Sequence, residues 1–301
     1  MIAASSTIPL LSGARFDLER HAQLFGPLPH ADHSVIASVG SAGLTGRGGA
    51  AFPAGRKMDS LRGRRAVVIA NGSEGEPLSS KDAVLLSDSP HLVLDGLSIA
   101  GAAIEATDSY LVVPEGRAEQ LRRAVLERRK SGWDTTAAHI VVSTAGFVSG
   151  EKSAVIAAAE GRRPVPKYSP TSSSVSGLKG RPTLVHNVET LAHIATIARF
   201  GVDWFRSSGL AGEPGTMLVT LSGAVNRPGV VEVSMGIPIG TLLADIGRTD
   251  LRRVRAVLIG GYHGNWLNSN EFAGRSLSRA SLAPLGAGPG AGVVHALSVE
   301  T

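Results

Sequence analysis

Between residues 65 and 160, short β-branched runs alternate with segments whose apolar residues recur at helical spacing. Buried strands are predicted at residues 66–70, 110–113 and 139–142. Helices are predicted at residues 82–86, 92–106, 117–130 and 150–160. Strands and helices that alternate in this way form a parallel sheet with crossover helices. The pattern therefore predicts an α/β fold.

The chain changes character after a Gly- and Ser-rich linker at residues 207–215. Beyond it, strands are predicted at 216–221, 230–233 and 256–259, a tight turn at 226–229 and a short helix at 239–246. A hairpin, a helix and a further strand in so short a stretch indicate a small α+β domain. Further helices are predicted at 16–24 and 187–200, and a proline-rich loop at 163–182.

The composition is that of a globular protein and excludes several kinds of site. With 43% hydrophobic and 18% charged residues, the 301-residue chain can bury a sizeable core. Because it contains no cysteine, disulfides, zinc–thiolate sites and iron–sulfur clusters held by its own thiolates are excluded. We predict no metal site.

Charge and apolar runs bear on partners and compartment. The net charge is +5, but the basic residues are dispersed, and the densest run, at 122–130, is best interpreted as a solvated helix face or a docking face for an acidic protein. With three Trp, three Tyr and seven Phe, stacking platforms for nucleic acid are scarce. No apolar run is long enough to span a membrane, and the N-terminus has no signal-peptide pattern. We expect a cytoplasmic protein that binds no nucleic acid.

A loop at residues 43–57 combines five glycines with three cations, which lets backbone approach an anionic ligand. A P-loop is excluded, because the Gly49-to-Gly55 spacing is one residue too long and the Lys-Ser/Thr pair is missing. Residues 46–51 match the Gly-x-Gly-x-x-Gly/Ala dinucleotide pattern. That pattern requires a strand directly before the loop, whereas the clearly predicted strand, residues 66–70, follows it. A surface loop without a ligand therefore stays open as an alternative.

The predicted strand at 66–70 runs directly into a polar and acidic loop, residues 71–77. Open α/β sheets bind their ligands at the carboxyl ends of the strands. A turn followed by a helix cap would also account for this loop. Together with the cationic glycine loop, it favours a ligand with both a phosphate and hydrogen-bonding heteroatoms, and flavin mononucleotide (FMN) has both.

Four segments together resemble one family, the FMN- and NADH-binding subunit of respiratory complex I and its relatives in bacterial hydrogenases and formate dehydrogenases. They are residues 43–57, 71–82 with Pro90-His91, 146–163 and 176–190. A fifth segment, 221–229, resembles the start of that family's β-grasp domain of soluble-ligand-binding type. The resemblance is collinear from about residue 35 to the C-terminus. It implies an N-terminal extension at 1–34, a Rossmann-like FMN-binding domain with a parallel sheet at 35–206, and the small β-grasp domain at 216–301.

Carried over position by position, the resemblance implies which residues hold FMN. Those expected along the flavin and its phosphate tail are Gly46, Arg47, Gly48, Gly49 and Lys57. Asn71 would bond the edge of the isoalloxazine, with Ser73 and Glu74 in the same loop. His186, Asn187 and Thr190 would open a helix whose N-terminus suits a phosphate. At 73 the family has an acidic residue and at 186 usually Asn, so Ser73 and His186 are departures.

The resemblance also implies a donor site, which departs further from the family. The expected catalytic residues are Glu76, near the donor, and Glu151, near the flavin; Phe52 is kept and could stack on a planar donor. Lys152 replaces a glutamate that the family associates with the NADH ribose, which could favour the extra phosphate of NADPH. Ser60 and Ser172 stand where the family has stacking aromatic rings. NADH recognition is therefore expected to be eroded.

The family's C-terminal helical bundle, whose cysteines hold a [4Fe–4S] cluster, is not in this sequence, and one sequence leaves open whether the natural chain continues. The resemblance implies an FMN-dependent electron-transfer oxidoreductase of NAD(P)H/ferredoxin type. It would take electrons from NAD(P)H or another hydride donor and pass them to an iron–sulfur partner such as a ferredoxin, within a hetero-oligomer. The alternative is a non-catalytic scaffold or binding subunit that has lost NADH binding, with or without the loss of FMN binding.

Overall fold

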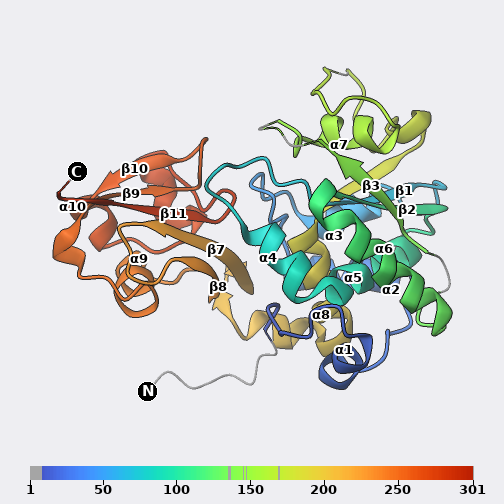
Figure 1. The fold of residues 1–301 in the computed structure, drawn as a ribbon, viewed down its shortest axis with the longest axis horizontal. Helices are drawn as coiled ribbons and strands as arrows, with labels where there is room; N and C mark the ends of the chain where they lie inside the picture. The colour runs from blue at the N-terminus through green and yellow to red at the C-terminus, as the bar shows by residue number, and fades with distance from the viewer. Residues whose placement is uncertain (1–8, 135–136, 145, 147, 169, 301) are drawn as a thin grey trace.

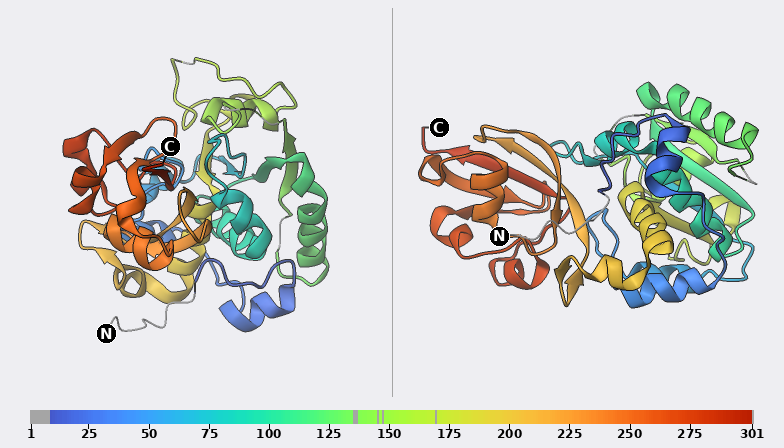
Figure 2. Two further views of the ribbon diagram at one scale, coloured as in Figure 1. Left: turned by 60° about the vertical axis from the view of Figure 1, so that its left-hand side comes forward. Right: turned by 90° about the horizontal axis from the view of Figure 1, so that it is seen from below.

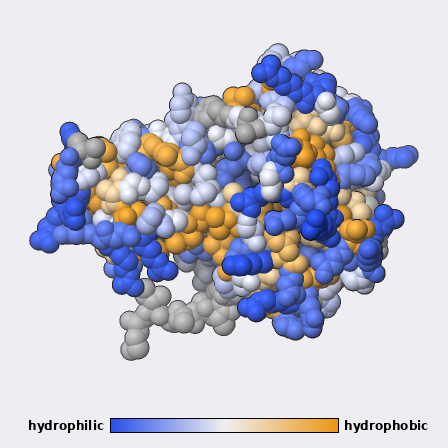
Figure 3. Space-filling model, in the orientation of Figure 1, coloured by the Kyte–Doolittle hydropathy of each residue, from blue (hydrophilic) through white to orange (hydrophobic). Residues whose placement is uncertain are grey.

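The computed structural model describes residues 9–134, 137–144, 146, 148–168 and 170–300 of the chain. Two sheets lie in separate halves placed side by side (Figures 1 and 2). The first half is built around the sheet whose strands lie between residues 67 and 187, and the second half around the sheet whose strands lie between residues 216 and 298. On the face drawn in Figure 3, apolar residues gather in the middle, where the halves adjoin, and hydrophilic residues dominate the outer ends. Within the described residues, no helix has the length and apolarity that crossing a bilayer requires.

The first sheet has four strands, all parallel, in the order β3-β2-β1-β4. They are β1 (Val67–Asn71), β2 (Asp108–Pro114), β3 (His139–Ser143) and β4 (Thr183–Asn187). This order is that of a Rossmann-like half-sheet, so the predicted α/β fold is confirmed. The sequence did not predict β4, because its apolar run, Leu184-Val185, is only two residues long and follows the proline-rich loop.

Helices cover both faces of this sheet. They are α1 (Leu18–Phe25), α2 (Ser34–Ala42), α3 (Ala54–Asp59), α4 (Lys81–Asp88), α5 (Pro90–Ala103), α6 (Glu115–Lys130), α7 (Lys152–Ala159) and α8 (Val188–Arg206), with a 3₁₀ turn at Leu178–Gly180. Alternate β1 residues enter different cores: Val68 packs with α5 and α8, whereas Val67 and Ile69 pack with α7. The period-2 alternation of a strand thus puts α7 on the opposite face.

The glycine loop joins two helices. Gly43, in the left-handed conformation at φ 73°, ends α2, and Pro53 precedes α3. A bridge between Thr45 and Pro53 and a bond from the Gly46 N–H to the Phe52 carbonyl (2.9 Å) close the loop at its base. Because a helix precedes the loop, the geometry of a dinucleotide fingerprint is absent here, in line with the sequence argument.

The second sheet has the order β10-β9-β11-β7-β8, with β11 parallel to β7. Its strands are β7 (Thr216–Gly223), β8 (Gly229–Ser234), β9 (Val254–Ile259), β10 (Asn265–Asn268) and β11 (Val293–Ser298). The short helices beside it are α9 (Ile239–Thr241), a π-helical turn Leu242–Ile246, 3₁₀ turns Leu251–Arg253 and Ala283–Leu285, α10 (Ser269–Ala273) and α11 (Arg279–Leu282). A hairpin, a helix and a mixed sheet whose first and last strands run parallel make a β-grasp arrangement. The strand β10 and helices α10 and α11 were not predicted.

The linker and the N-terminal segment connect the two halves. Residues 207–215 contain a small two-stranded ribbon, β5 (Gly209–Leu210) and β6 (Glu213–Pro214). The Leu10 N–H donates to Glu232 Oε2 on β8 (2.6 Å), and burial raises the pKa of Glu232 to about 7. In α1, His21 Nε2 lies 2.7 Å from Asp95 Oδ2 in α5. The described part of the expected extension therefore packs on both halves; residues 1–8 lie outside the described residues, and the predicted domain limits remain predictions.

Asp95 is the centre of a buried charge cluster that ties four helices together. It accepts from Arg128 (2.7 Å) and Arg199 (2.6 Å) as well as His21. Burial opposes its ionisation, but these partners hold the pKa of Asp95 well below its usual range. Because the cations come from α6 and α8, the cluster fixes both helices against α5.

Gly96 should be indispensable to the contact between α5 and α8. A Cβ at this position would lie 1.9 Å from the Leu191 carbonyl oxygen, and backbone cannot move aside cheaply. We expect Gly96→Ala to lower the free energy of unfolding by about 3 kcal/mol in urea denaturation. The helical Gly116, whose Cβ would meet nothing, is the matched control, and Gly116→Ala should stabilise by up to about 1 kcal/mol. Equal stability of both variants would contradict this packing.

Candidate functional site

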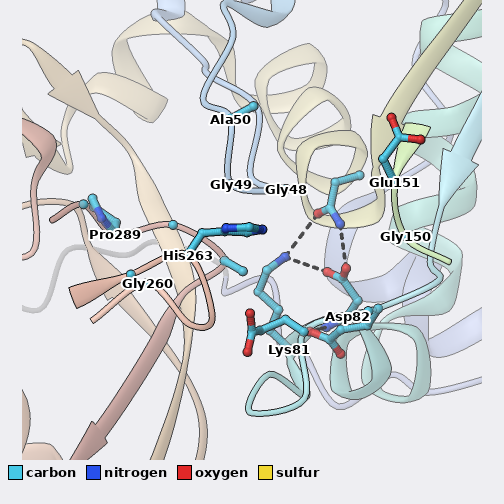
Figure 4. A pocket seen from close by; sticks show the side chains of 18 of the residues that line it. Gly48, Gly49, Ala50, Lys81, Asp82, Gly150, Glu151, Gly260, His263 and Pro289 are labelled. Carbon is cyan, nitrogen blue, oxygen red and sulfur yellow. Dashed lines mark hydrogen bonds and ion pairs between the residues drawn. The ribbon is translucent and has the colours of Figure 1, made fainter. Parts of the chain in front are cut away.

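A cavity of about 600 Å³ opens between the two halves at the carboxyl ends of β1 and β4. One side is formed by residues 48–50, the loop after β1, Gly150 and Asn187. The other side is formed by two glycine-rich loops of the second half, at 260–264 and 286–291, together with Arg279. Figure 4 shows these walls facing one another across the open space. Segments far apart in the sequence therefore share one ligand-sized site.

Backbone rather than side chains forms much of the wall on the first half. Gly48 lies so close to α8 that a Cβ there would be 3.4 Å from Asn187 Cβ. A Cβ on Gly150 would lie 2.5 Å from the Ser73 carbonyl oxygen, so the loop before α7 can pack against the loop after β1 only with glycine here. The result is a flat wall that a ring system can approach closely.

The loop after β1 is held in place by side chains predicted to bind FMN. The Asn71 amide donates to the Gly150 carbonyl (2.9 Å), and its oxygen accepts from the Ser73 N–H (3.1 Å). The Ser73 hydroxyl donates to Ser149 Oγ (3.1 Å). Asn71 and Ser73 both line the cavity, and these bonds orient them there.

A buried ionic network forms the floor of the cavity, which Lys81, Asp82 and Asn187 line. Lys81 Nζ lies 2.7 Å from Asp82 Oδ1 and 2.8 Å from Glu189 Oε2, and it also donates to Asn187 Oδ1 (3.2 Å). The Asn187 amide donates to Asp82 Oδ2 (2.6 Å). Figure 4 draws the contact between Lys81 and Asp82 as a dashed line. Burial lowers the pKa of Lys81, but the carboxylates outweigh it and the net shift is upward. Lys81 is therefore a charged, fully paired ammonium group.

The same network reaches the second half. Glu189 Oε1 accepts from the Leu218 N–H of β7 (2.8 Å), and Thr220 Oγ1 accepts from the Ser80 N–H (3.1 Å). The position of β7, and with it the loops at the far wall, thus depends on residues beside the cavity floor.

The two glutamates of the acidic loop have different environments. Glu74 accepts from the Ser79 hydroxyl, and burial together with the nearby Asp82 raises its pKa. Glu76, one of the two predicted catalytic residues, accepts from the Tyr262 N–H of the second half (2.8 Å). Both line the cavity, so two carboxyl groups face a ligand there.

Several predicted FMN residues lie outside the cavity lining. Arg47 is buried and donates to Thr45 Oγ1 (3.2 Å) and the Pro214 carbonyl (3.4 Å), while its backbone N–H donates to Thr190 Oγ1 (2.9 Å). Gly46 lies at the closed base of the same loop. The arginine therefore joins the glycine loop to α8 and to the linker.

Lys57 and His186 form a second group behind the glycine loop. Lys57 donates to the Val185 carbonyl, and burial with the nearby Lys152 lowers its pKa to about 8. Burial likewise keeps the pKa of His186 well below its usual range, and its Nε2 has no hydrogen-bond partner among the described residues. The expectation that His186 opens a helix was wrong: His186 belongs to β4, and Asn187 is the N-cap of α8, accepting from the Glu189 N–H (3.0 Å).

Of the residues predicted for catalysis and for the donor site, Glu76 and Glu151 line the cavity, whereas Phe52 and Lys152 do not. Glu151 lines the cavity and caps α7 by accepting from the Ser153 N–H (2.7 Å), and Lys152 is the first, exposed residue of that helix. Phe52 is 53% exposed and lies outside the lining. Ser60 and Ser172 are exposed and also lie outside it.

Sequence reasoning did not identify the far wall. His263, Arg279 and the loop at 286–291 all line the cavity. The signals that could have identified it are the paired glycines at 260–261 and the glycine-rich stretch at 286–292, which indicate close approach of backbone to a ligand. Among the described residues, no cluster of three or more His, Cys, Asp or Glu is arranged to hold a metal ion.

Comparison with known proteins identifies relatives of the chain. The profile of the Nuo51 FMN-binding domain family matches residues 39–196. The chain is 33% identical over 244 residues to a component of the NADH-quinone oxidoreductase of Rhizobium meliloti, covering 75% of this chain and 58% of that protein. It is 35% identical over 259 residues to NADP-reducing hydrogenase subunit HndC of Solidesulfovibrio fructosivorans, covering 79% and 52%. The chain thus spans about half the length of the curated relatives it matches.

A solved structure shares the fold. The crystal structure of an NAD⁺-reducing [NiFe]-hydrogenase in the air-oxidized state superposes with a TM-score of 0.80 at 31% sequence identity. The match covers 89% of this chain and 47% of the hydrogenase chain. Both halves of the chain therefore take part in the likeness.

The lowered pKa of Lys57 predicts that the stability of the fold depends on pH. The pKa of Lys57 is about 8 in the folded state, against 10.5 for an ordinary lysine, so the folded state releases the proton more readily. Below pH 8, Lys57 is charged in both states, and burying that charge lowers the free energy of unfolding by the full amount. Above about pH 10.5, Lys57 is neutral in both states and this cost disappears. We expect Lys57→Met to raise the free energy of unfolding by about 2–3 kcal/mol at pH 7, reduced by the loss of the hydrogen bond to the Val185 carbonyl. This gain in stability should be smaller at about pH 9.5.

Urea denaturation at both pH values measures the difference. Lys130, exposed at the end of α6, is the control, and Lys130→Met should change stability by less than about 0.5 kcal/mol at either pH. A gain for Lys57→Met that does not depend on pH would rule out the proposed cause.

Proposed function

Because this chain belongs to the Nuo51 FMN-binding domain family, we propose that it binds FMN in the cavity between its halves and works as an electron-transfer oxidoreductase. The observation on which this depends is the glycine-walled cavity at the carboxyl ends of β1 and β4, beside the N-terminus of α8. The FMN-binding domain would be residues 35–206 and the β-grasp domain residues 216–301.

The residues present fit FMN. Behind the glycine loop and outside the cavity lining, Arg47 is buried and Lys57 is half-buried. Among the described residues, both donate to carbonyl or hydroxyl oxygens rather than to a carboxylate. Such cations favour an anionic ligand nearby. The N-terminus of the 19-residue helix α8 adds a favourable site for a phosphate, with Asn187 as its N-cap and Thr190 in its first turn. Gly48 and Gly49 would flank the ring system, and Asn71, Ser73 and Glu74 would face its polar edge.

FMN, when bound, supplies the hydride and one-electron chemistry. The chain's own residues would bind it, orient it and set the surrounding charge. Glu76 and Glu151 contribute carboxylates at the cavity, and these disfavour further negative charge there. Burial and the nearby Asp82 raise the pKa of Glu74, which also lines the cavity. The paired Lys81 network holds the floor rigid beneath these groups.

The electron donor would be NAD(P)H or another hydride donor. HndC, with 35% identity to this chain, is named as a subunit of an NADP-reducing hydrogenase, and the hydrogenase with the similar fold is NAD⁺-reducing. Lys152 is an exposed cation at the start of α7, beside Glu151 at the rim. A cation there suits the 2′-phosphate of NADPH better than the 2′-hydroxyl of NADH. Phe52, exposed on the glycine loop, would be available to a planar donor.

The electron acceptor would be an iron–sulfur protein such as a ferredoxin, in a hetero-oligomer. The chain has no cysteine, so it holds no iron–sulfur cluster by thiolates of its own. Relatives at 33–35% identity are subunits of NADH-quinone oxidoreductase and hydrogenase. Electrons leaving this cavity would pass to such an iron–sulfur centre.

The visible spectrum of the purified protein tests the proposal. We expect flavin absorption, or its appearance on reconstitution with FMN, with a spectrum shifted from that of free FMN by the enclosed site. Gly150→Val should abolish uptake, because even a Cβ would collide with the Ser73 carbonyl at the cavity wall. Gly146→Val, where a Cβ meets nothing, is the control and should retain FMN. A folded wild-type protein that takes up no FMN would contradict the proposal and favour the alternative, a scaffold or binding subunit.

The role of Lys152 is tested by anaerobic titration of the FMN-loaded protein with NADH and NADPH. We expect NADPH to be preferred, and Lys152→Glu to shift the ratio of kcat/KM values toward NADH by about tenfold or more, because the reversed charge repels the 2′-phosphate. Lys167→Glu, on the exposed loop after α7, is the charge-matched control. An unchanged ratio in Lys152→Glu would remove Lys152 from the donor site.

A further inference from the structure

The cavity has very few aromatic groups. Among the described residues that line it, the imidazole of His263 is the only aromatic ring, and it comes from the second half of the molecule. The first half offers glycines, amides and carboxylates instead. A planar ligand ring lying on the glycine wall therefore meets an aromatic face only on the opposite side.

The loop that presents His263 has a tightly fixed conformation. It joins β9 to β10, and its Tyr262 N–H donates to Glu76 Oε2 across the cavity mouth (2.8 Å). Gly261 has φ +87°, and a Cβ there would lie 2.4 Å from the same carboxylate oxygen. The Gly264 N–H donates to the Gly261 carbonyl (2.8 Å). Few backbone conformations satisfy these constraints, so the position of His263 is set by the first half of the chain.

The ring itself points into the cavity. Figure 4 shows the His263 side chain extending from the loop toward the space in front of Gly48 and Gly49. The Tyr262 ring packs against it edge-on, with centroids 5.3 Å apart and planes at 87°. Such an edge-to-face pair restrains the orientation of the imidazole.

We propose that His263 is a specificity-determining residue of the donor site, stacking on the planar heteroaromatic ring of the electron donor. This inference depends on the proposed function. It assigns to the β-grasp half a contact that Ser60 and Ser172, both outside the cavity, do not make. The ligand class is a nicotinamide, an adenine or another flat π-system that approaches the flavin from the far wall.

The test uses the full chain loaded with FMN. Reduction by NADH and by NADPH is followed anaerobically, and re-oxidation of the photoreduced protein is followed with menadione, a planar quinone, and with ferricyanide, which has no ring to stack. We expect His263→Ala to raise KM for menadione and for whichever nucleotide reduces the flavin by about tenfold, the loss expected for one stacked ring. His263→Phe should restore it, and ferricyanide rates should be unchanged.

Controls separate the possible failures. His33→Ala removes an exposed histidine before α2 and should alter none of the four reactions. Unchanged KM values for the ring-bearing reagents in FMN-loaded His263→Ala overturn the inference and leave the proposed function intact. An equal loss with ferricyanide also overturns it, because a stacking contact would not affect that reagent. A wild-type protein that takes up no FMN removes the proposed function and this inference together.

Discussion

The ion pair between Lys81 and Glu189 is the contact on which the rest of the site depends. Both side chains are buried, so either would be costly without the other. Lys81 belongs to the helix after the acidic loop, and Glu189 to the first turn of α8. The second oxygen of Glu189 accepts from the Leu218 N–H of β7. One pair of charges thus sets the cavity floor and aligns the second sheet with the first.

That alignment explains why the cavity can have walls of opposite character. On one side, glycine backbone and amides are fixed by hydrogen bonds within the first half, as at Asn71. On the other side, loops between the strands of the second sheet are positioned through Glu76 and the floor network. Neither wall is a complete binding site, and only their relative placement encloses a volume of ligand size.

Much of the fold could be predicted from the sequence, because β1, β2 and β3 are continuous apolar runs and the helices between them have clear periodicity. The strand β4 could not be predicted, since its apolar run, Leu184-Val185, is short. Its pairing with β1 joins residues more than a hundred positions apart. The polar loop after β1 was identifiable as cavity lining because strand ends in parallel sheets meet at one edge. The contributions of Arg47 and His263 depend on tertiary contacts that no local pattern records.

The cavity draws its walls from residues 48–50 and from residues 286–291, which are more than two hundred positions apart. During synthesis the first sheet can form well before the last of these loops leaves the ribosome, since domains fold from the N-terminus onward. In that interval the glycine wall faces water with nothing opposite it. An enclosed site exists only once β11 has paired with β7. Tight retention of a ligand between the halves is therefore a late event in the life of each molecule, after both sheets have been translated.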